Sequence, residues 1–217
     1  MKRLALILAV SLLLTATAWS QTSNIKATLA EAQNGNAEAQ TDLGYMYFHG
    51  EGVARDYEKA LEWYKKAAAQ NDVYAQYNLG IIYDQGEGVP QDLVTAFGWY
   101  KQAADNDLPH AQHNVANMYQ MGEGVARDYA KALYWYEKAA GKGYPPAQFN
   151  LGRMYYEGLG AEKDYVRAYA WMRLAHANGD SEALDVLAEM TAAMTPEQIT
   201  AGDDLLQLWL NEERDSF

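Results

Sequence analysis

Small and apolar residues recur at steps of three and four positions along much of the chain. In residues 57–68 the recurring side chains are Ala60, Leu61, Tyr64, Ala67 and Ala68. This spacing places them on one side of a helix and predicts a buried stripe. The preceding segment, residues 37–49, has a similar pattern and ends at the Gly50-Glu51-Gly52 loop. The pattern therefore predicts a pair of helices joined by a glycine-containing loop.

The same pair of helices recurs at a step of 36 residues. Aligned positions include the Ala-Gln pairs that begin at 39, 75, 111 and 147, and the glycines at 50, 86, 122 and 158. They also include the aspartates at 56, 92, 128 and 164 and the tryptophans at 63, 99, 135 and 171. Such units stack to bury a core that no single unit can bury. The sequence therefore predicts a repeat array, with the tryptophans in its core.

The repeated motif A-x-x-x-L-G-x-x-Y-x-x-G-x-G-V-x-x-D-x-x-K-A-x-x-W-Y-x-K-A-A resembles the Sel-one-like repeat (SLR) family, which is related to the tetratricopeptide repeat. The resemblance implies an all-α fold, a right-handed α/α superhelical solenoid of helix-turn-helix repeats. We expect four repeats, at residues 36–71, 72–107, 108–143 and 144–180. Residues 21–35 are expected to form an N-terminal capping helix.

The chain ends differ from the repeats. Residues 1–20 combine Lys2 and Arg3 with an uncharged run and small residues, the pattern of a secretory signal peptide. Residues 181–217 fit a partial repeat followed by a C-terminal capping helix, opened by a capping box at Thr195-Pro196-Glu197-Gln198. We therefore expect a periplasmic or secreted monomer without a lipid anchor or membrane insertion after signal removal.

Composition narrows the chemistry. The formal net charge of −12 disfavours a nucleic-acid partner, because an acidic surface repels phosphates. The chain has no cysteine, which excludes disulfides, thiol catalysis and thiolate metal sites. A carboxylate between the loop glycines argues against a phosphate loop, and the glycines are expected to end helices instead. The sequence predicts no cofactor.

Two short patterns resemble parts of metal or catalytic sites. His110 and His113 have a spacing that suits a metal, but no third ligand completes a site, so they are interpreted as surface residues. Ser23-Asn24-Ile25-Lys26 matches the Ser-x-x-Lys of penicillin-recognising enzymes, but the companion motifs are absent and the match is interpreted as chance. We therefore expect neither a metal site nor catalytic residues, and no enzymatic activity.

Comparison of the four copies points to a binding surface. The face of the first helices that varies between repeats carries aromatic and apolar residues that the stack does not need. In the helical solenoids that this repeat family resembles, the first helices line a concave groove that holds a peptide or a partner's helix. The predicted partner-binding residues are Tyr45, Phe48, Tyr74, Tyr77, Ile81, His113, Asn117, Phe149, Arg153 and Tyr156.

The predicted function is an exported protein-interaction scaffold that binds a partner protein or peptide. Cell-envelope assembly, host-factor binding and toxin immunity are roles that the resemblance implies. Two alternatives remain open, a cell-wall-related hydrolase and a peptidoglycan-binding module. A further alternative is that some of the aromatic side chains close interfaces between repeats rather than bind a partner.

Overall fold

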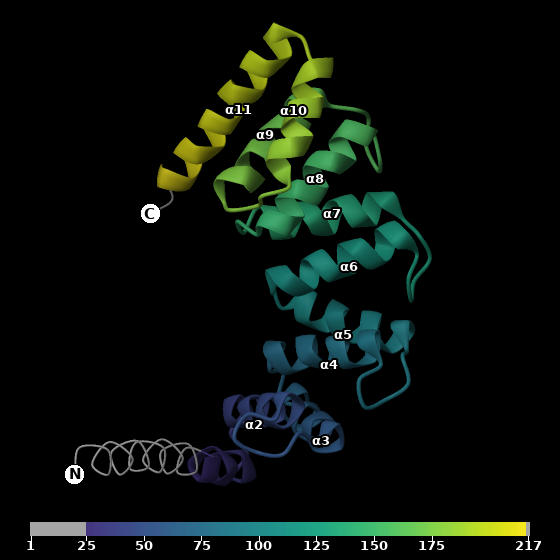
Figure 1. Ribbon diagram of the computed structural model, residues 1–217, viewed down its shortest axis with the longest axis vertical. Helices are drawn as coiled ribbons and strands as arrows, with labels where there is room; N and C mark the ends of the chain where they lie inside the picture. Colours follow the sequence, from purple (N-terminus) through teal and green to yellow (C-terminus); the bar gives the residue numbers. More distant parts are fainter. Residues whose placement is uncertain (1–24, 216–217) are drawn as a thin grey trace, which may run out of the picture. The chain divides into compact units, whose positions relative to one another are not determined.

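The computed structural model describes residues 25–215, and the predicted signal segment lies outside that range (Figure 1). The described residues contain α-helices and no strand. The chain divides into two compact units, one that ends at Asp92 and one that begins at Leu93. The expected all-α repeat fold is confirmed.

Unit 1 contains helical residues 25–33, α2 (Ala37–His49), α3 (Tyr57–Ala68) and α4 (Val73–Gln85). Helices α2 and α3 pack side by side, and α4 packs on α3. The helical residues 25–33 contribute Ala32 to a core shared with Ala39 and Leu43 of α2. Small side chains allow this close packing: a Cβ added at Gly44 would lie 2.7 Å from Cδ1 of the buried Tyr64.

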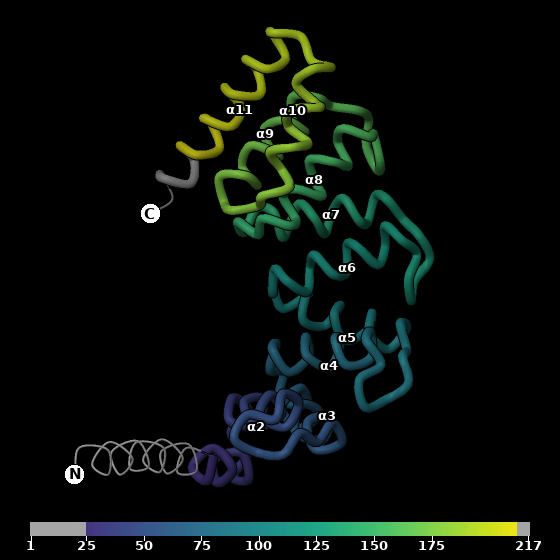
Figure 2. Tube along the Cα trace, in the orientation of Figure 1, coloured from purple at the N-terminus to yellow at the C-terminus, as the bar shows by residue number. Residues whose placement is uncertain are grey.

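Unit 2 contains α5 (Leu93–Asp105), α6 (Pro109–Met121), α7 (Tyr129–Ala140), α8 (Pro145–Glu157), α9 (Tyr165–Ala177), α10 (Ala183–Ala193) and α11 (Pro196–Asp215). Successive helices from α5 to α10 lie side by side, and α11 packs on α9. The loops that join α6 to α7 and α8 to α9 emerge at the same edge of this unit (Figure 2).

The last helix closes the end of unit 2. Leu206 of α11 is buried with Ala170 and Leu174 of α9, and the rings of Trp171 and Trp209 lie 4.4 Å apart. The capping box at the start of α11 has both of its hydrogen bonds. The Thr195 amide donates to Oε1 of Gln198 (2.9 Å), and the Gln198 amide donates to Oγ1 of Thr195 (3.3 Å).

Helix ends follow the side chains that the repeat supplies. Asn36 and Asp72 accept hydrogen bonds from backbone amides in the first turns of α2 and α4. Pro109 and Pro145 occupy the first positions of α6 and α8, where no amide hydrogen is needed. The first helices end at glycines in the left-handed conformation, at positions 50, 86, 122 and 158.

The second glycine of each loop joins one repeat to the repeat before it. Gly124 and Gly160 have φ values of 66° and 77°. A Cβ at Gly124 would collide with the carbonyl oxygen of Leu93, and a Cβ at Gly160 would collide with that of Tyr129. Leu93 and Tyr129 are the first residues of α5 and α7, which are the second helices of the preceding repeats. Backbone conformation and close approach therefore both require glycine here.

A buried glutamine links helices in the same way in several repeats. The Nε2 groups of Gln40, Gln112 and Gln148 donate to backbone carbonyls at the end of the preceding helix, at 3.0, 3.2 and 3.1 Å. The carbonyl oxygens of Gln40 and Gln148 accept from Gln70 and Asn178, at 2.8 and 3.0 Å. We call this arrangement the glutamine clamp.

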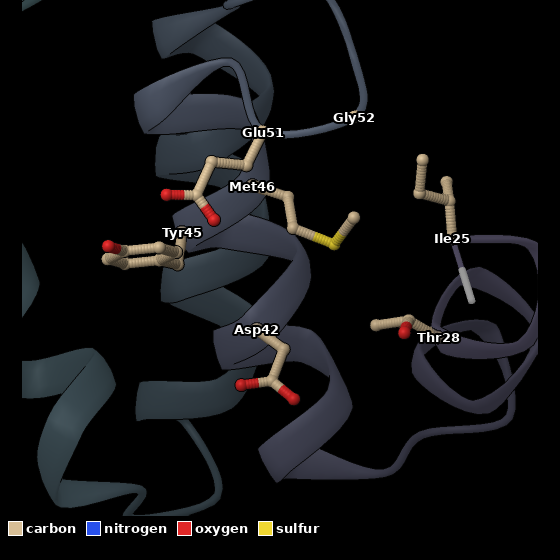
Figure 3. A pocket seen from close by; sticks show the side chains of 7 residues that line it. All are labelled: Ile25, Thr28, Asp42, Tyr45, Met46, Glu51 and Gly52. Atoms are coloured by element: carbon tan, nitrogen blue, oxygen red, sulfur yellow. The ribbon is translucent and has the colours of Figure 1, made fainter. Parts of the chain in front are cut away.

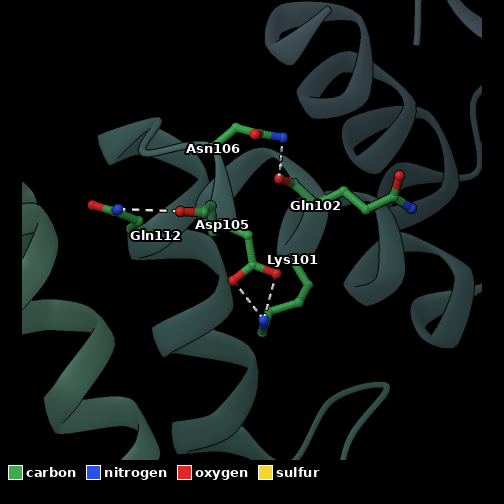
Figure 4. Close-up of polar contacts among 6 residues, drawn as sticks. Lys101, Gln102, Asp105, Asn106 and Gln112 are labelled. Carbon is green, nitrogen blue, oxygen red and sulfur yellow. Dashed lines mark hydrogen bonds and ion pairs between the residues drawn. The ribbon is translucent and has the colours of Figure 1, made fainter. Parts of the chain in front are cut away.

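The glutamine clamp is incomplete at Gln112. Its Oε1 atom is buried and has no hydrogen-bond partner. The residue aligned with Asn178 is Lys142, whose ammonium group instead contacts the Asp107 carboxylate (3.0 Å) and backbone carbonyl (2.7 Å). Figure 4 shows Gln112 beside the end of α5, where Asn106 donates to the Gln102 carbonyl (3.0 Å). The sequence difference at position 142 thus leaves a buried acceptor unpaired.

The tryptophans are less buried than predicted. Trp135 is 6% exposed, but Trp63 and Trp171 are half-buried. The next residue in the motif is the fully buried one, as Tyr64 and Tyr136 show. A Lys66 ammonium lies 4.1 Å from the centre of the Trp63 ring, so this ring has one face against a surface cation.

Candidate partner-binding site

The first-helix face of unit 1 carries the most exposed of its predicted binding residues. Tyr45 on α2 is 43% exposed and Tyr74 on α4 is 61% exposed, whereas Tyr77 and Ile81 are half-buried. Phe48 is also half-buried and packs edge-on against the Tyr57 ring, at 5.3 Å between centroids. The five residues therefore divide into two exposed tyrosines and three side chains that are partly packed within the fold.

A cavity of about 460 Å³ lies next to Tyr45 in unit 1. Figure 3 shows that its walls come from three segments: helical residues 25–33, α2, and the loop after α2. The lining residues are Ile25, Thr28, Asp42, Tyr45, Met46, Glu51 and Gly52. The cavity thus combines apolar side chains, one aromatic ring and two carboxylates.

The two carboxylates at this cavity belong to Asp42 and Glu51. Burial, together with the nearby carboxylates of Glu38 and Asp72, raises the pKa of Asp42 above its usual value. Within residues 25–211, where side chains are described, neither Asp42 nor Glu51 belongs to an ion pair. The charged residues that line the cavity are therefore both acidic.

Unit 2 holds two of the predicted residues in an internal polar network. His113 is half-buried, and its Nε2 lies 3.0 Å from Nδ2 of Asn150 on α8. Its Nδ1 lies 3.4 Å from Nδ2 of Asn117. The buried Tyr136 hydroxyl contacts the Asn117 side-chain oxygen and donates to Oε1 of Gln120 (2.7 Å). The network joins α6, α7 and α8.

The interpretation of His113 as an ordinary surface residue is wrong. Its ring packs against Tyr136 and Tyr144, with centroid distances of 5.7 and 5.4 Å. Burial lowers the pKa of this imidazole, because the charged form loses solvation. His110 is exposed, with its ring 4.6 Å from that of Tyr144. His113 is therefore a neutral, packed group at pH 7.

The remaining predicted residues lie on α8. Phe149 and Tyr156 are half-buried, and the Tyr156 ring packs edge-on against Tyr165 at 5.4 Å. Arg153 is exposed, and its guanidinium lies 3.2 Å from the Glu157 carboxylate. Arg153 and part of the two aromatic surfaces thus remain accessible on this helix.

The metal and Ser-x-x-Lys candidates of the sequence analysis differ in whether the structure describes them. No group of three or more His, Asp or Glu side chains there is arranged to hold a metal ion. Ser23, the residue that a Ser-x-x-Lys site would need, lies outside the described range. No described helix has both the length and the apolar character to cross a membrane.

Sequence comparison of the repeats missed two parts of these sites. The cavity depends on Ile25, which lies before the first repeat, at the position aligned with Leu61, and which a comparison of the four full copies leaves out. The network depends on Asn150, which the comparison of repeats assigned to neither face, and on Tyr136, which belongs to the repeated motif. A signal was present at the aligned positions 42, 78, 114 and 150, which are Asp, Asn, Asn and Asn. A polar residue at the same position of every repeat indicates that this position forms hydrogen bonds in each repeat.

The arrangement of helix pairs with glycine-ended first helices agrees with a known repeat family. The Sel1 repeat family model matches residues 37–72, 73–108, 109–144 and 145–180, and each match begins one residue later than the repeat expected from the sequence. The chain belongs to the Sel1 repeat family. Sel1-repeat proteins are generally protein-interaction scaffolds, and the fold is generally non-catalytic.

Solved Sel1-repeat structures resemble this chain over most of its length. A protective antigen of uropathogenic Escherichia coli, described as displaying an SLR fold, is 36% identical, with a TM-score of 0.78. The match covers 88% of this chain and 41% of the antigen. A Sel1 repeat protein from Oxalobacter formigenes is 33% identical, with a TM-score of 0.72, over 76% of this chain and 48% of that one.

A curated relative matches a shorter segment. The secretory immunoglobulin A-binding protein EsiB of Escherichia coli O6:H1 is 36% identical over 44 residues, which make up 20% of this chain and 9% of EsiB. The chain therefore spans less than half the length of the two solved relatives and a small part of this curated one.

Proposed function

We propose that this Sel1-repeat protein is an exported, non-enzymatic scaffold that binds a partner protein or peptide through the variable faces of its first helices. The exposure of Tyr45 and Tyr74 carries the proposal, because large aromatic side chains contribute strongly to protein interfaces. The pattern of residues 1–20 supports export to the periplasm or cell exterior. The immunoglobulin-binding activity named for EsiB is consistent with a protein partner.

The structure narrows which predicted residues are suitable probes of binding. Tyr45 and Tyr74 are exposed, and truncation should remove contact area without opening a core cavity. Phe48, Tyr77 and Phe149 are half-buried, so truncation there also changes packing. His113 and Asn117 support α7 and α8 through the polar network. The sharpest test therefore uses the two exposed tyrosines.

Affinity capture from a bacterial envelope extract tests this proposal. The full chain is compared with a Tyr45→Ala/Tyr74→Ala variant and with Tyr134→Ala, a control that removes a tyrosine of similar exposure (50%) from the second helix α7. We expect a protein retained by the full chain and the control but lost by the double variant, with unchanged helical circular dichroism. Equal retention by all three proteins would contradict the assignment of the first-helix face.

A further inference from the structure

The first-helix face of unit 1 carries acidic side chains but no lysine or arginine. Neither α2 nor α4 contains a lysine or arginine, whereas acidic residues lie on both helices and at the N-cap of α4. Those acidic residues are Glu38, Asp42, Asp72 and Asp84. A binding partner that matches this face in charge must be basic.

Most cations of the same unit are engaged elsewhere. Lys59 pairs with Asp56 (2.9 Å) and Lys66 with Glu62 (2.7 Å), on the other helix of the repeat. The Arg55 guanidinium lies over the Tyr57 ring, 5.3 Å from its centre. Lys26 is exposed on the helical residues 25–33 and, among the described side chains, has no ion-pair partner. No described ion pair therefore occupies Asp42 or Glu51, and their carboxylates can meet a cationic ligand.

The cavity beside Tyr45 has the chemistry that a long cationic side chain requires. Met46 and Ile25 offer apolar contact for methylene groups, and the Tyr45 ring offers a π face (Figure 3). Asp42 and Glu51 place carboxylates on two different segments of the wall. Two separate acceptors suit the several N–H donors of a guanidinium better than the compact charge of an ammonium.

We propose that this cavity binds an arginine side chain from a basic segment of the partner protein. The aliphatic part of the arginine lies against Met46 and Tyr45, and its guanidinium lies between Asp42 and Glu51. The volume of about 460 Å³ is within the range of roughly 300–1,000 Å³ that is usual for ligand sites. This inference rests on the proposed scaffold function and specifies the chemistry of the partner.

The test uses the full chain labelled with ¹³C at the methionine methyl groups. The probe is the peptide Gly-Ser-Leu-Arg-Leu-Ser-Gly, and its control carries citrulline, a neutral isostere, in place of arginine. Met46 lines the cavity and is one of eight methionines, so its methyl resonance reports the site separately from the others. We expect a saturable shift of the Met46 resonance with the arginine peptide and at least tenfold weaker binding of the citrulline peptide.

Charge-neutral variants show whether the two carboxylates are responsible. Asp42→Asn/Glu51→Gln should lose at least tenfold in affinity for the arginine peptide. Glu58→Gln/Glu62→Gln removes the same charge from α3 and should retain the affinity of the unchanged chain. The absence of a Met46 shift, equal binding of both peptides, or equal loss in the two double variants would overturn the proposal.

Failure of the arginine site is separable from failure of the scaffold function. A partner that is captured through Tyr45 and Tyr74, and is retained equally by Asp42→Asn/Glu51→Gln, would contradict the arginine site and leave the scaffold function in place. The absence of both a captured partner and a peptide response would contradict the two proposals together.

Discussion

Replacement of Lys142 with asparagine should stabilise the fold by completing the glutamine clamp. Asn178, at the aligned position of the next repeat, donates to the Gln148 carbonyl at 3.0 Å. The corresponding carbonyl of Gln112 is buried without a partner. The Lys142→Asn variant brings the same amide to the same position and gives this acceptor a donor.

The expected gain follows from the hydrogen bond that the variant adds and the two Lys142 contacts that it removes. An unsatisfied buried acceptor costs about 1–3 kcal/mol, and a hydrogen bond contributes about 0.5–1.5 kcal/mol net. The variant removes the contacts of Lys142 with the Asp107 carboxylate and backbone carbonyl. Both side chains are well exposed (37% and 67%), so the ion pair contributes little, and water can replace the exposed hydrogen bond to the carbonyl. We expect a net gain of about 1 kcal/mol, which in a chain of this size raises Tm by roughly 2–4 °C.

Urea and thermal denaturation, followed by circular dichroism, measure this gain. Lys142→Ala is the matched control, because it removes the ion pair without supplying an amide. The reverse exchange, Asn178→Lys, should orphan the Gln148 carbonyl and lower the free energy of unfolding by about 1–3 kcal/mol. If Lys142→Asn is no more stable than Lys142→Ala, the clamp does not contribute as described.

Three further predictions concern other parts of the fold. The pKa of His113 is lowered from its ordinary 6.5, so the unfolded chain binds more protons than the folded chain just below that pH. The free energy of unfolding should therefore fall as the pH falls below about 6.5. His113→Phe should remove this component from the difference between urea midpoints measured above and below that pH. Gly160→Ala should lower the free energy of unfolding by about 1–3 kcal/mol. Gly143 has a similar φ (76°) but no atom near an added Cβ, so Gly143→Ala should lower the free energy of unfolding by less. Equal losses in the two variants would refute a role for the close approach at Gly160. Thr195→Ala should cost about 1 kcal/mol in thermal melts through loss of the cap of α11, and an unchanged Tm would contradict this.

The sequence was sufficient to predict the repeated framework. The 36-residue step predicted the helix pairs, and the loop glycines and capping residues predicted where first helices end. These features depend on local backbone chemistry that recurs in every copy. Even so, the motif placed Trp63 too deep in the core, because helical spacing cannot separate a buried position from its half-buried neighbour.

The candidate binding surface was less predictable because it depends on contacts outside the four full repeats. The cavity requires Ile25, which belongs to the helical residues that precede the first repeat. His113 is packed by Tyr144 and bonded to Asn150, and neither contact follows from its position on α6. The accessible residues could be proposed from variation among copies, but their partition into exposed and packed side chains required the three-dimensional contacts.

The contact of each second loop glycine has a consequence for how long such a chain can be. Gly88 meets Tyr57, Gly124 meets Leu93 and Gly160 meets Tyr129, so the same two positions meet at each step. Each repeat therefore contacts the next repeat through the same position that the previous repeat uses to contact it. An in-frame duplication or deletion of one complete repeat joins surfaces that already match. The number of variable helix faces can thus change in evolution while the contact between successive repeats stays the same.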